Sequence, residues 1–282
     1  MLIGSHRAGV GITLAVAVII SIVFSSGCVS SSSSTWNERK TGAVKIDAAK
    51  VVDLSYTFGP DTIYWPTAEP FKLRRVSYGR TAAGYWYVAN NLSMAEHGGT
   101  HMDAPLHFGE GKMTAAEVPL ANCIGPAVVI DVTDLAVHDR DYRMSLADVT
   151  RWERQHGAMP RGAIVIMHSG WGRRWPDKKR YLGTDKPMDV ANLHFPGFSQ
   201  EATEFLVRER DVAALAVDTP SIDYGQSKDF IAHQVLNAAN KPAFENVANV
   251  DRLPATGATF IALPLKIEDG SGGPTRIIAV LP

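Results

Sequence analysis

The sequence has few cysteines and no excess of charge of either sign. Its 282 residues include only 2 cysteines, too few for a scaffold built on disulfides, and a chain of this length can bury a core without them. Lys and Arg number 28 against 29 Asp and Glu, so the net charge is −1 and nothing indicates nucleic acid as a partner. Because 45% of the residues are hydrophobic, wholesale disorder is also excluded.

Charged residues are nearly absent from the first 27 positions as well. Arg7 is followed by an apolar run over 8–24 and then by Ser-Ser-Gly directly before Cys28. A basic residue, an apolar run and small residues before a cysteine are typical of a secretory signal that ends at a lipidated cysteine. The run is slightly shorter than the ~20 residues that span a membrane, and an uncleaved anchor is the alternative interpretation.

We therefore predict a lipoprotein-type signal peptide over 1–27, a Ser-rich tether over 28–45 and one domain over 46–282. The serine run over 30–34 is typical of a flexible linker. The mature protein is expected to be exported and held at the cell envelope by lipid on Cys28. Val29 favours the outer membrane if the cell is Gram-negative, and Cys123 is left without an intramolecular partner.

The body alternates between strand-like and helical segments. Short runs rich in β-branched residues predict strands over 51–54, 85–92, 127–132, 163–167, 212–217, 259–263 and 276–280. Ser145 and Ser199 are N-cap residues for predicted helices over 146–156 and 200–210, and Thr114 with Glu117 predicts a third, short helix. The expected fold class is α/β, with a single domain in which helices flank a mixed sheet.

Four residues that can bind metal lie within eleven positions. Residues 97–108 read HGGTHMDAPLHF, in which His97, His101, Asp103 and His107 are the polar side chains of interest. Two glycines and a proline argue against a helix, so we expect a strand over 85–92 to run into a bent loop that brings these side chains together. Imidazole and carboxylate groups suit Zn²⁺ or Mn²⁺, and a set of two histidines and one aspartate leaves room for water.

This run resembles the H-x-G-T-H-x-D-x-P-x-H signature of the metal-dependent cyclase family, which includes bacterial kynurenine formamidases and isatin hydrolases. The resemblance implies a cyclase-like domain with a barrel-like core. It also implies that His97, His101 and Asp103 are metal ligands, with Asp103 able to bridge two ions. His107 is then the catalytic acid/base.

The resemblance extends over about residues 47–282. After Asp218-Thr219-Pro220-Ser221, His233 and Glu245 stand twelve residues apart, as the remaining two ligands of the formamidases do. Taken alone, His233 would more often be structural and Glu245 an ordinary surface carboxylate. The resemblance implies instead that they complete a second site, so that the chain holds two Zn²⁺ or Mn²⁺ ions. Trp65 matches an aromatic residue of the substrate pocket, although a core tryptophan is an equal alternative.

The resemblance implies a hydrolase of an amide C–N bond, most like an arylformamidase that converts N-formyl-L-kynurenine to L-kynurenine and formate. A metal-activated water would attack the carbonyl, with His107 as acid/base near its ordinary pKa of ~6.5. The first alternative is an isatin hydrolase-like enzyme that opens a cyclic amide, imide or lactone, with residues 170–198 shaping its pocket. The second is a non-catalytic, lipid-tethered binding protein. The expected partners are a small aromatic amide or cyclic substrate, the membrane through the lipid, and further copies in a homodimer or homotetramer.

Overall fold

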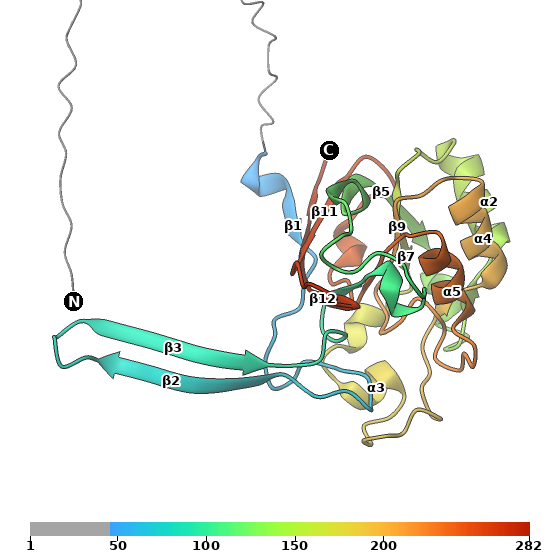
Figure 1. The fold of residues 1–282 in the computed structure, drawn as a ribbon. Helices are drawn as coiled ribbons and strands as arrows, with labels where there is room; N and C mark the ends of the chain where they lie inside the picture. The colour runs from blue at the N-terminus through green and yellow to red at the C-terminus, as the bar shows by residue number, and fades with distance from the viewer. Residues whose placement is uncertain (1–45) are drawn as a thin grey trace, which may run out of the picture. The chain divides into compact units, whose positions relative to one another are not determined.

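Neighbouring strands close into a barrel in the computed structural model, which describes residues 46–282 (Figure 1). The predicted signal peptide, Cys28 and the tether over 28–45 lie outside the described residues. The barrel strands are β4 (His101–Asp103), β5 (Ile124–Asp131), β7 (Ile164–His168), β9 (Ala214–Val217), β10 (Ala243–Glu245), β11 (Thr259–Pro264) and β12 (Gly272–Val280). They follow one another around the barrel as β12, β11, β5, β7, β9, β10 and β4, and β4 pairs with β12 to close it.

The barrel is a mixed sheet, as predicted. Its run from β5 through β7 and β9 to β10 is parallel, and the remaining neighbours are antiparallel. Strand β1 (Val51–Asp53) extends the sheet by pairing with β12. Because parallel strands end at the same edge, the carboxyl ends of β7, β9 and β10 gather at one end of the barrel.

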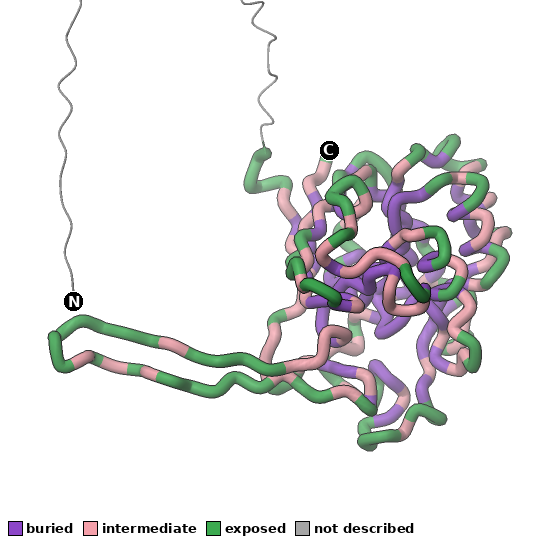
Figure 2. Tube along the Cα trace, viewed as in Figure 1, coloured by how far each residue is buried: buried purple, intermediate pink, exposed green. Residues whose placement is uncertain are grey.

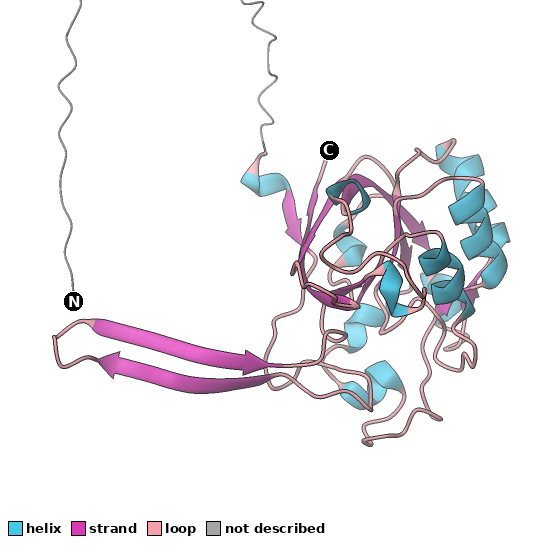
Figure 3. Cartoon of the chain, viewed as in Figure 1, coloured by secondary structure: helices cyan, strands magenta, loops and turns pink. Residues whose placement is uncertain are grey.

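Helices cover one side of the barrel (Figure 3). The α-helices are α1 (Thr133–Ala136), α2 (Leu146–His156), α3 (Lys178–Leu182), α4 (Gln200–Arg208) and α5 (Ile231–Ala238). Single 3₁₀ turns are η1 (Ala48–Lys50), η2 (Pro105–His107), η3 (Leu120–Asn122), η4 (Trp171–Arg174) and η5 (Val250–Arg252). Within residues 46–282, no helix is both long and apolar enough to cross a bilayer.

Two of the three predicted helix starts are confirmed. Ser145 and Asp148 form a full capping box at α2, and the Ser199 side chain accepts the Ala202 N–H at α4. The predicted helix after Thr114 is wrong, because this segment is only a turn in which the Thr114 N–H donates to Glu117 Oε2 at 2.9 Å. Pro119 has no N–H with which to continue a helix from that turn.

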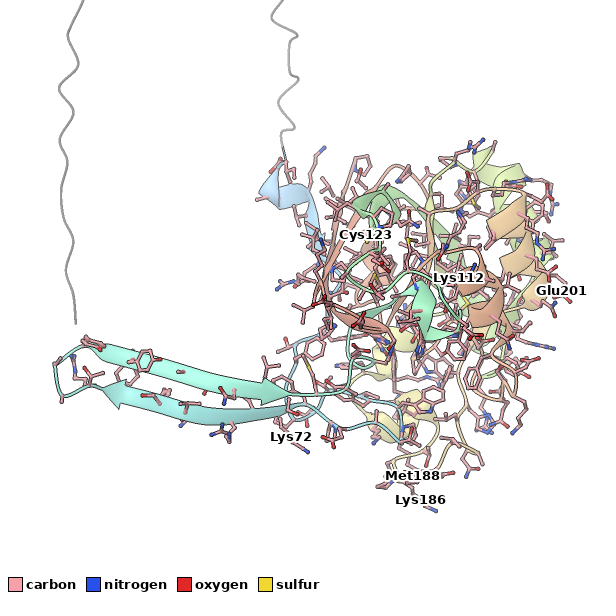
Figure 4. All side chains as sticks on the ribbon, in the orientation of Figure 1. Lys72, Lys112, Cys123, Lys186, Met188 and Glu201 are labelled. Carbon is pink, nitrogen blue, oxygen red and sulfur yellow. The ribbon has the colours of Figure 1, made fainter. Side chains whose placement is uncertain are left out.

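Successive side chains along a barrel strand point alternately into two different hydrophobic cores. On β5, Ala127 and Val129 point into the barrel, whereas Val128 and Ile130 point outward beneath the helices. This period of two follows from the pleat and recurs on β7 and β9. Much of the barrel interior is alanine, which suits the narrow space inside seven strands, and Cys123 is buried in the same core (Figure 4).

Two strand pairs lie outside the barrel. Strands β6 (Arg143–Met144) and β8 (Gly197–Phe198) form a short parallel pair. Strands β2 (Lys72–Arg80) and β3 (Trp86–Ser93) form a long hairpin that extends away from the barrel and is exposed over most of its length (Figures 1 and 2). The strand predicted over 85–92 is β3, but the sequence analysis did not predict its partner β2.

Candidate metal centre

The closing strand of the barrel, β4, carries two of the predicted metal ligands. It pairs with β10 on one side and β12 on the other, and His101 stands opposite Glu245 in this register. His101 and Asp103 share one face because side chains alternate along a strand, and Met102 between them enters the barrel core. The expectation of a bent loop is therefore corrected: the loop ends at Thr100, and the two ligand candidates lie on a strand held by neighbours on both sides.

Two glycines allow this close arrangement. Gly99 has a φ of +57°, in the left-handed region that glycine adopts without strain, and its carbonyl accepts a hydrogen bond from His101 Nδ1 at 3.0 Å. A Cβ at Gly272 would overlap the Met102 carbonyl oxygen and lie 2.6 Å from His97 Cε1. The chain turns sharply before β4, and β12 approaches it closely behind His97.

Three histidines meet at the buried carboxylate of Asp103. His97 Nδ1 lies 2.6 Å from Oδ1, and His101 Nε2 lies 3.1 Å from the same oxygen. His233 Nε2, from α5, lies 3.1 Å from Oδ2. The carboxylate is 1% exposed, and each of its oxygens faces at least one imidazole nitrogen.

Glu245 joins the same cluster from the end of β10. Its Oε1 lies 3.2 Å from His233 Nε2, and its Oε2 lies 3.5 Å from His101 Nε2. The structure thus brings the five predicted ligands together, although they span 149 positions of the chain. Atoms that could hold one ion form two groups, His97–Asp103–His107 and His101–Asp103–Glu245.

In the structure His97 and His101 belong to different groups, whereas the sequence analysis placed both of them, with Asp103, in one set of ligands. Asp103 belongs to both groups. His107, predicted only as an acid/base, is close enough to the first group to contribute a nitrogen.

The donor set fits a divalent cation. His101 Nδ1 is bound by the Gly99 carbonyl, whereas Nε2 is buried with no hydrogen-bond partner and faces two carboxylates. Imidazole nitrogens with carboxylate oxygens are ligands that Zn²⁺ and Mn²⁺ accept. An orphaned nitrogen is costly to bury, and a metal ion would satisfy it.

Charge in the cluster leads to the same conclusion. Burial opposes the charged ring of His101, but Asp103 and Glu245 outweigh it and raise its pKa to about 9. Burial also opposes charge on His233, yet the carboxylates of Asp103, Asp223 and Glu245 raise its pKa above the usual value. Without metal, protons on these two rings neutralise the buried carboxylates, which is the electrostatic task that a divalent cation would take over.

Asp223 orients His233, a role that sequence reasoning missed. His233 Nδ1 donates to Asp223 Oδ2 at 2.7 Å, and the same carboxylate accepts the backbone N–H groups of Ala232 and His233. One buried side chain therefore fixes the start of α5 and directs Nε2 of His233 toward Asp103 and Glu245. Asp223 lies in the Asp218–Asp223 motif, but a carboxylate ten residues before a histidine carries no signal of its own.

A second missed carboxylate supports His97. This carboxylate belongs to Glu96. Nε2 of His97 lies 2.8 Å from Ser271 Oγ, and the Ser271 hydroxyl donates to Glu96 Oε2 at 2.6 Å. With Nε2 held by serine, Nδ1 of His97 faces Asp103. Metal-binding histidines commonly have such partners on the nitrogen that does not bind the ion.

His107 lies in η2 with its ring stacked on His97, at a centroid distance of 3.8 Å. Burial lowers the pKa of His107 to about 3, so the ring is neutral in the metal-free protein. This differs from the expected pKa near 6.5, because the sequence does not reveal that the ring is enclosed. A neutral imidazole has one N–H donor and one nitrogen that can accept a proton, and it acts as a general acid once that second nitrogen is protonated.

The cluster lies in a cavity of about 280 Å³ with mostly apolar walls. Trp65, Phe108 and Phe230 line it, and Leu182 contributes from the segment 170–198. This volume is at the small end of ligand pockets and suits one ring with few substituents. His168, at the end of β7, lines a different, more polar pocket and lies 3.6 Å from Asp131 Oδ2.

Comparison with known proteins gives consistent matches. The Cyclase family model matches residues 52–224. An isatin hydrolase from Roseibium aggregatum is 30% identical over 248 residues, covering 83% of this chain and 92% of that protein. A kynurenine formamidase from Erythrobacter litoralis is 27% identical over 229 residues, with coverages of 81% and 93%. The solved structure of isatin hydrolase A from Ralstonia solanacearum gives a TM-score of 0.75 at 34% identity, covering 82% of this chain and 92% of that one.

Replacing Asp223 by Asn should weaken metal binding, because the asparagine can no longer accept the Nδ1–H as a carboxylate does. We expect affinity for Zn²⁺ or Mn²⁺ to fall roughly 10- to 100-fold, measured by competition with a chelator and by metal analysis. Asp229→Asn is the matched control, since Asp229 is exposed and six residues away. Equal metal affinity in the two variants would contradict the positioning role.

Proposed function

Because the chain belongs to the Cyclase family, we propose that it is a metal-dependent hydrolase that cleaves the C–N bond of a small aromatic amide. The observation that carries this proposal is the cluster centred on Asp103 at the wall of a small apolar cavity. The polar groups would perform the chemistry, and the apolar walls would hold a flat ring. A binding protein without turnover would not need His107, which lines the cavity beside the metal-binding cluster.

Five side chains would hold the metal: His97, His101, Asp103, His233 and Glu245. When bound, a divalent ion supplies Lewis acidity, which lowers the pKa of water from ~15.7 toward ~7 and polarises a carbonyl. Asp103 touches three of the histidines, so it would be the ligand that all of them share a site with. Asp223 and Ser271 keep two of the rings turned toward that carboxylate.

His107 would move the proton. Its ring lines the cavity next to the cluster and would take a proton from the attacking water. The same nitrogen can then give that proton to the departing nitrogen of the amide. Phe108, 4.5 Å away between ring centroids, provides an apolar surface on one side of the His107 ring.

Opening of a ring amide of the isatin type is the best supported reaction. The sequence motifs alone favoured an arylformamidase, but identity is higher to isatin hydrolases, at 30% and 34%, than to the formamidase, at 27%. Isatin is a planar, fused bicyclic molecule whose lactam would present its carbonyl to the cluster while its ring lies between apolar walls. Trp65, which makes an edge contact with Phe195 at 6.2 Å, would offer its face for stacking.

Hydrolysis of N-formyl-L-kynurenine remains the second candidate, supported by the similarity to the formamidase. Both reactions break an amide C–N bond next to an aromatic ring and need the same groups. They differ in whether the carbonyl lies in the ring or on a substituent. Comparing the hydrolysis rates of the two substrates therefore distinguishes the two reactions.

The full-length protein should hydrolyse isatin to isatinate faster than it deformylates N-formyl-L-kynurenine, as judged by kcat/KM from absorbance assays run in parallel. Dialysis against a strong chelator should remove the activity, and added Zn²⁺ or Mn²⁺ should restore it. Faster turnover of the formyl substrate would assign the formamidase reaction instead. Turnover that survives complete metal removal would refute the metal-dependent proposal.

His107→Ala should reduce kcat by roughly 10²- to 10⁴-fold if the ring moves a proton. Metal content, measured on the same preparation, separates this role from that of a ligand. We expect the content to stay near the wild-type value while kcat falls. His138→Ala, which removes an exposed histidine, is the control and should leave both quantities unchanged. A parallel loss of metal and activity would make His107 a ligand.

We also propose that the enzyme is exported and anchored at the cell envelope by lipid on Cys28, on the outer membrane if the cell is Gram-negative. The support is the Arg7, apolar-run and Ser-Ser-Gly-Cys pattern of the sequence. A substrate reaching the enzyme there would arrive from outside the cytoplasm. That location is unusual for tryptophan breakdown, and it is a further reason to favour a ring amide over N-formylkynurenine.

Cells that express the wild-type chain should incorporate labelled palmitate into it, and mass spectrometry should find the mature chain beginning at Cys28. Cys28→Ser should abolish the label, whereas Cys123→Ala should keep it because Cys123 is buried in the barrel core. A membrane-bound, unlabelled chain that retains residues 1–27 would identify an uncleaved anchor instead.

A further inference from the structure

Phe230 precedes helix α5 in a backbone conformation that phenylalanine seldom adopts. Its φ is +51° and its ψ is +43°, which is the left-handed region. Within residues 46–282, five of the seven non-glycine residues with positive φ are Asn or Asp, whose short polar side chains tolerate this region. A bulky aromatic residue is strained there, and strained residues concentrate at binding and catalytic sites.

The start of the helix does not explain this strain. Phe230 occupies the N-cap position of α5, yet its side chain makes no capping hydrogen bond. Asp223 caps the helix instead, because its two carboxylate oxygens accept the backbone N–H groups of Ala232 and His233 at 3.0 and 3.1 Å. Glycine or asparagine at position 230 would relax the backbone, and asparagine is also a favoured N-cap residue. The helix therefore gives no reason for a phenylalanine at this position.

The position of the aromatic ring does give a reason. Phe230 lines the cavity beside the metal-binding cluster. Its ring centroid lies 5.3 Å from that of Phe108 and 6.3 Å from that of Trp65, both within the usual range for aromatic pairs. Phe108 in turn lies 4.5 Å from the ring of His107. Phe230 thus joins Trp65, the ring expected to stack on the substrate, to the neighbour of His107 in one aromatic wall.

The backbone that carries this ring is held on both sides. The N–H of Phe230 donates to Ser227 Oγ at 3.0 Å, and its carbonyl accepts the N–H of Gln234 at 3.0 Å. The next turn of α5 carries His233, whose ring centroid is 6.5 Å from that of Phe230. Because Asp223 fixes both the start of α5 and the ring of His233, the aromatic wall and the metal-binding cluster share one support.

We propose that Phe230 is a specificity-determining residue that limits the size of the ring system the cavity accepts. Its ring closes the cavity on the side of α5, so an unsubstituted bicyclic amide fits, whereas a ring with a substituent directed toward α5 collides with Phe230. The inference rests on the proposed function, because it takes a ring amide as the substrate.

Hydrolysis of substituted isatins tests the size limit. The four isatins with a single bromine on the benzene ring are compared with isatin by kcat/KM, for the wild type and for Phe230→Leu. Leucine keeps the position apolar but is smaller than phenylalanine, so it opens the wall. For at least one bromoisatin, the ratio of its kcat/KM to that of isatin should rise roughly 10-fold or more above the wild-type ratio. Comparison with the wild type removes the electronic effect of bromine.

Two further variants make the test specific. Phe230→Trp should lower the same ratio, because a larger ring narrows the cavity. Phe205→Leu is the matched control, since Phe205 is partly buried on α4 beneath Arg210 and does not line the cavity. Its ratio should stay within about 3-fold of the wild-type value. Metal content and far-UV circular dichroism check that each variant keeps the cluster and the fold.

Two results with Phe230→Leu would overturn the size limit. One is an unchanged ratio for all four bromoisatins, and the other is an equal loss of kcat/KM for every substrate together with loss of metal, which would make Phe230 a support for α5 only. If the wild type does not open the ring amide, dissociation constants of the same compounds, measured by calorimetry on the Zn²⁺-loaded protein, replace kcat/KM. Binding that follows the size of residue 230 would then support the size limit although the proposed reaction fails. A wild type that binds none of these compounds would overturn both.

Discussion

The buried carboxylate of Asp103 is the constraint around which the site is arranged. A charged group that is 1% exposed is stable only when opposite charge or hydrogen-bond donors surround it, and three imidazoles do so here. They come from the loop before β4, from β4 itself and from α5. Those histidines in turn need partners on their other nitrogens, which Gly99, Asp223 and Ser271 provide. Satisfying one buried charge thus determines the position of several elements.

The chemistry of the site could be predicted from the sequence because four of its residues lie close together in the chain. His97, His101, Asp103 and His107 fall within eleven residues, and the residue types alone indicate metal binding. The closing position of β4 could not be predicted, because three residues between glycines and a proline give no strand periodicity. Asp223 and Glu96 were missed for another reason: their roles depend on which nitrogen of His233 or His97 faces Asp103, and only the packed structure shows this.

The other elements of the fold were likewise predictable where their signal lies in a local stretch of sequence, and not where it depends on packing with distant residues. Strands β5 and β7 could be predicted because both of their faces are buried, which gives them continuous runs of β-branched residues. Strand β2 was not, since Arg74 and Arg75 interrupt its pattern and the face it builds is complete only with β3. The cap at Ser145 predicted a helix correctly, whereas Thr114 did not, because a cap indicates a start and Pro119 determined what followed.

Strand β4 has a consequence for how such a sequence can evolve. His101 and Asp103 alternate with Met102, so a shift of one residue against β10 would turn both polar side chains into the barrel and a thioether into the cavity. Just before β4, a Cβ at Gly98 or Gly99 would overlap the ring of Tyr64 or Phe58. Larger residues are therefore excluded at these two positions unless those rings move. The turn of the hairpin, over 82–84, is exposed and has open space around Gly84, so substitutions there can accumulate while the catalytic geometry stays unchanged.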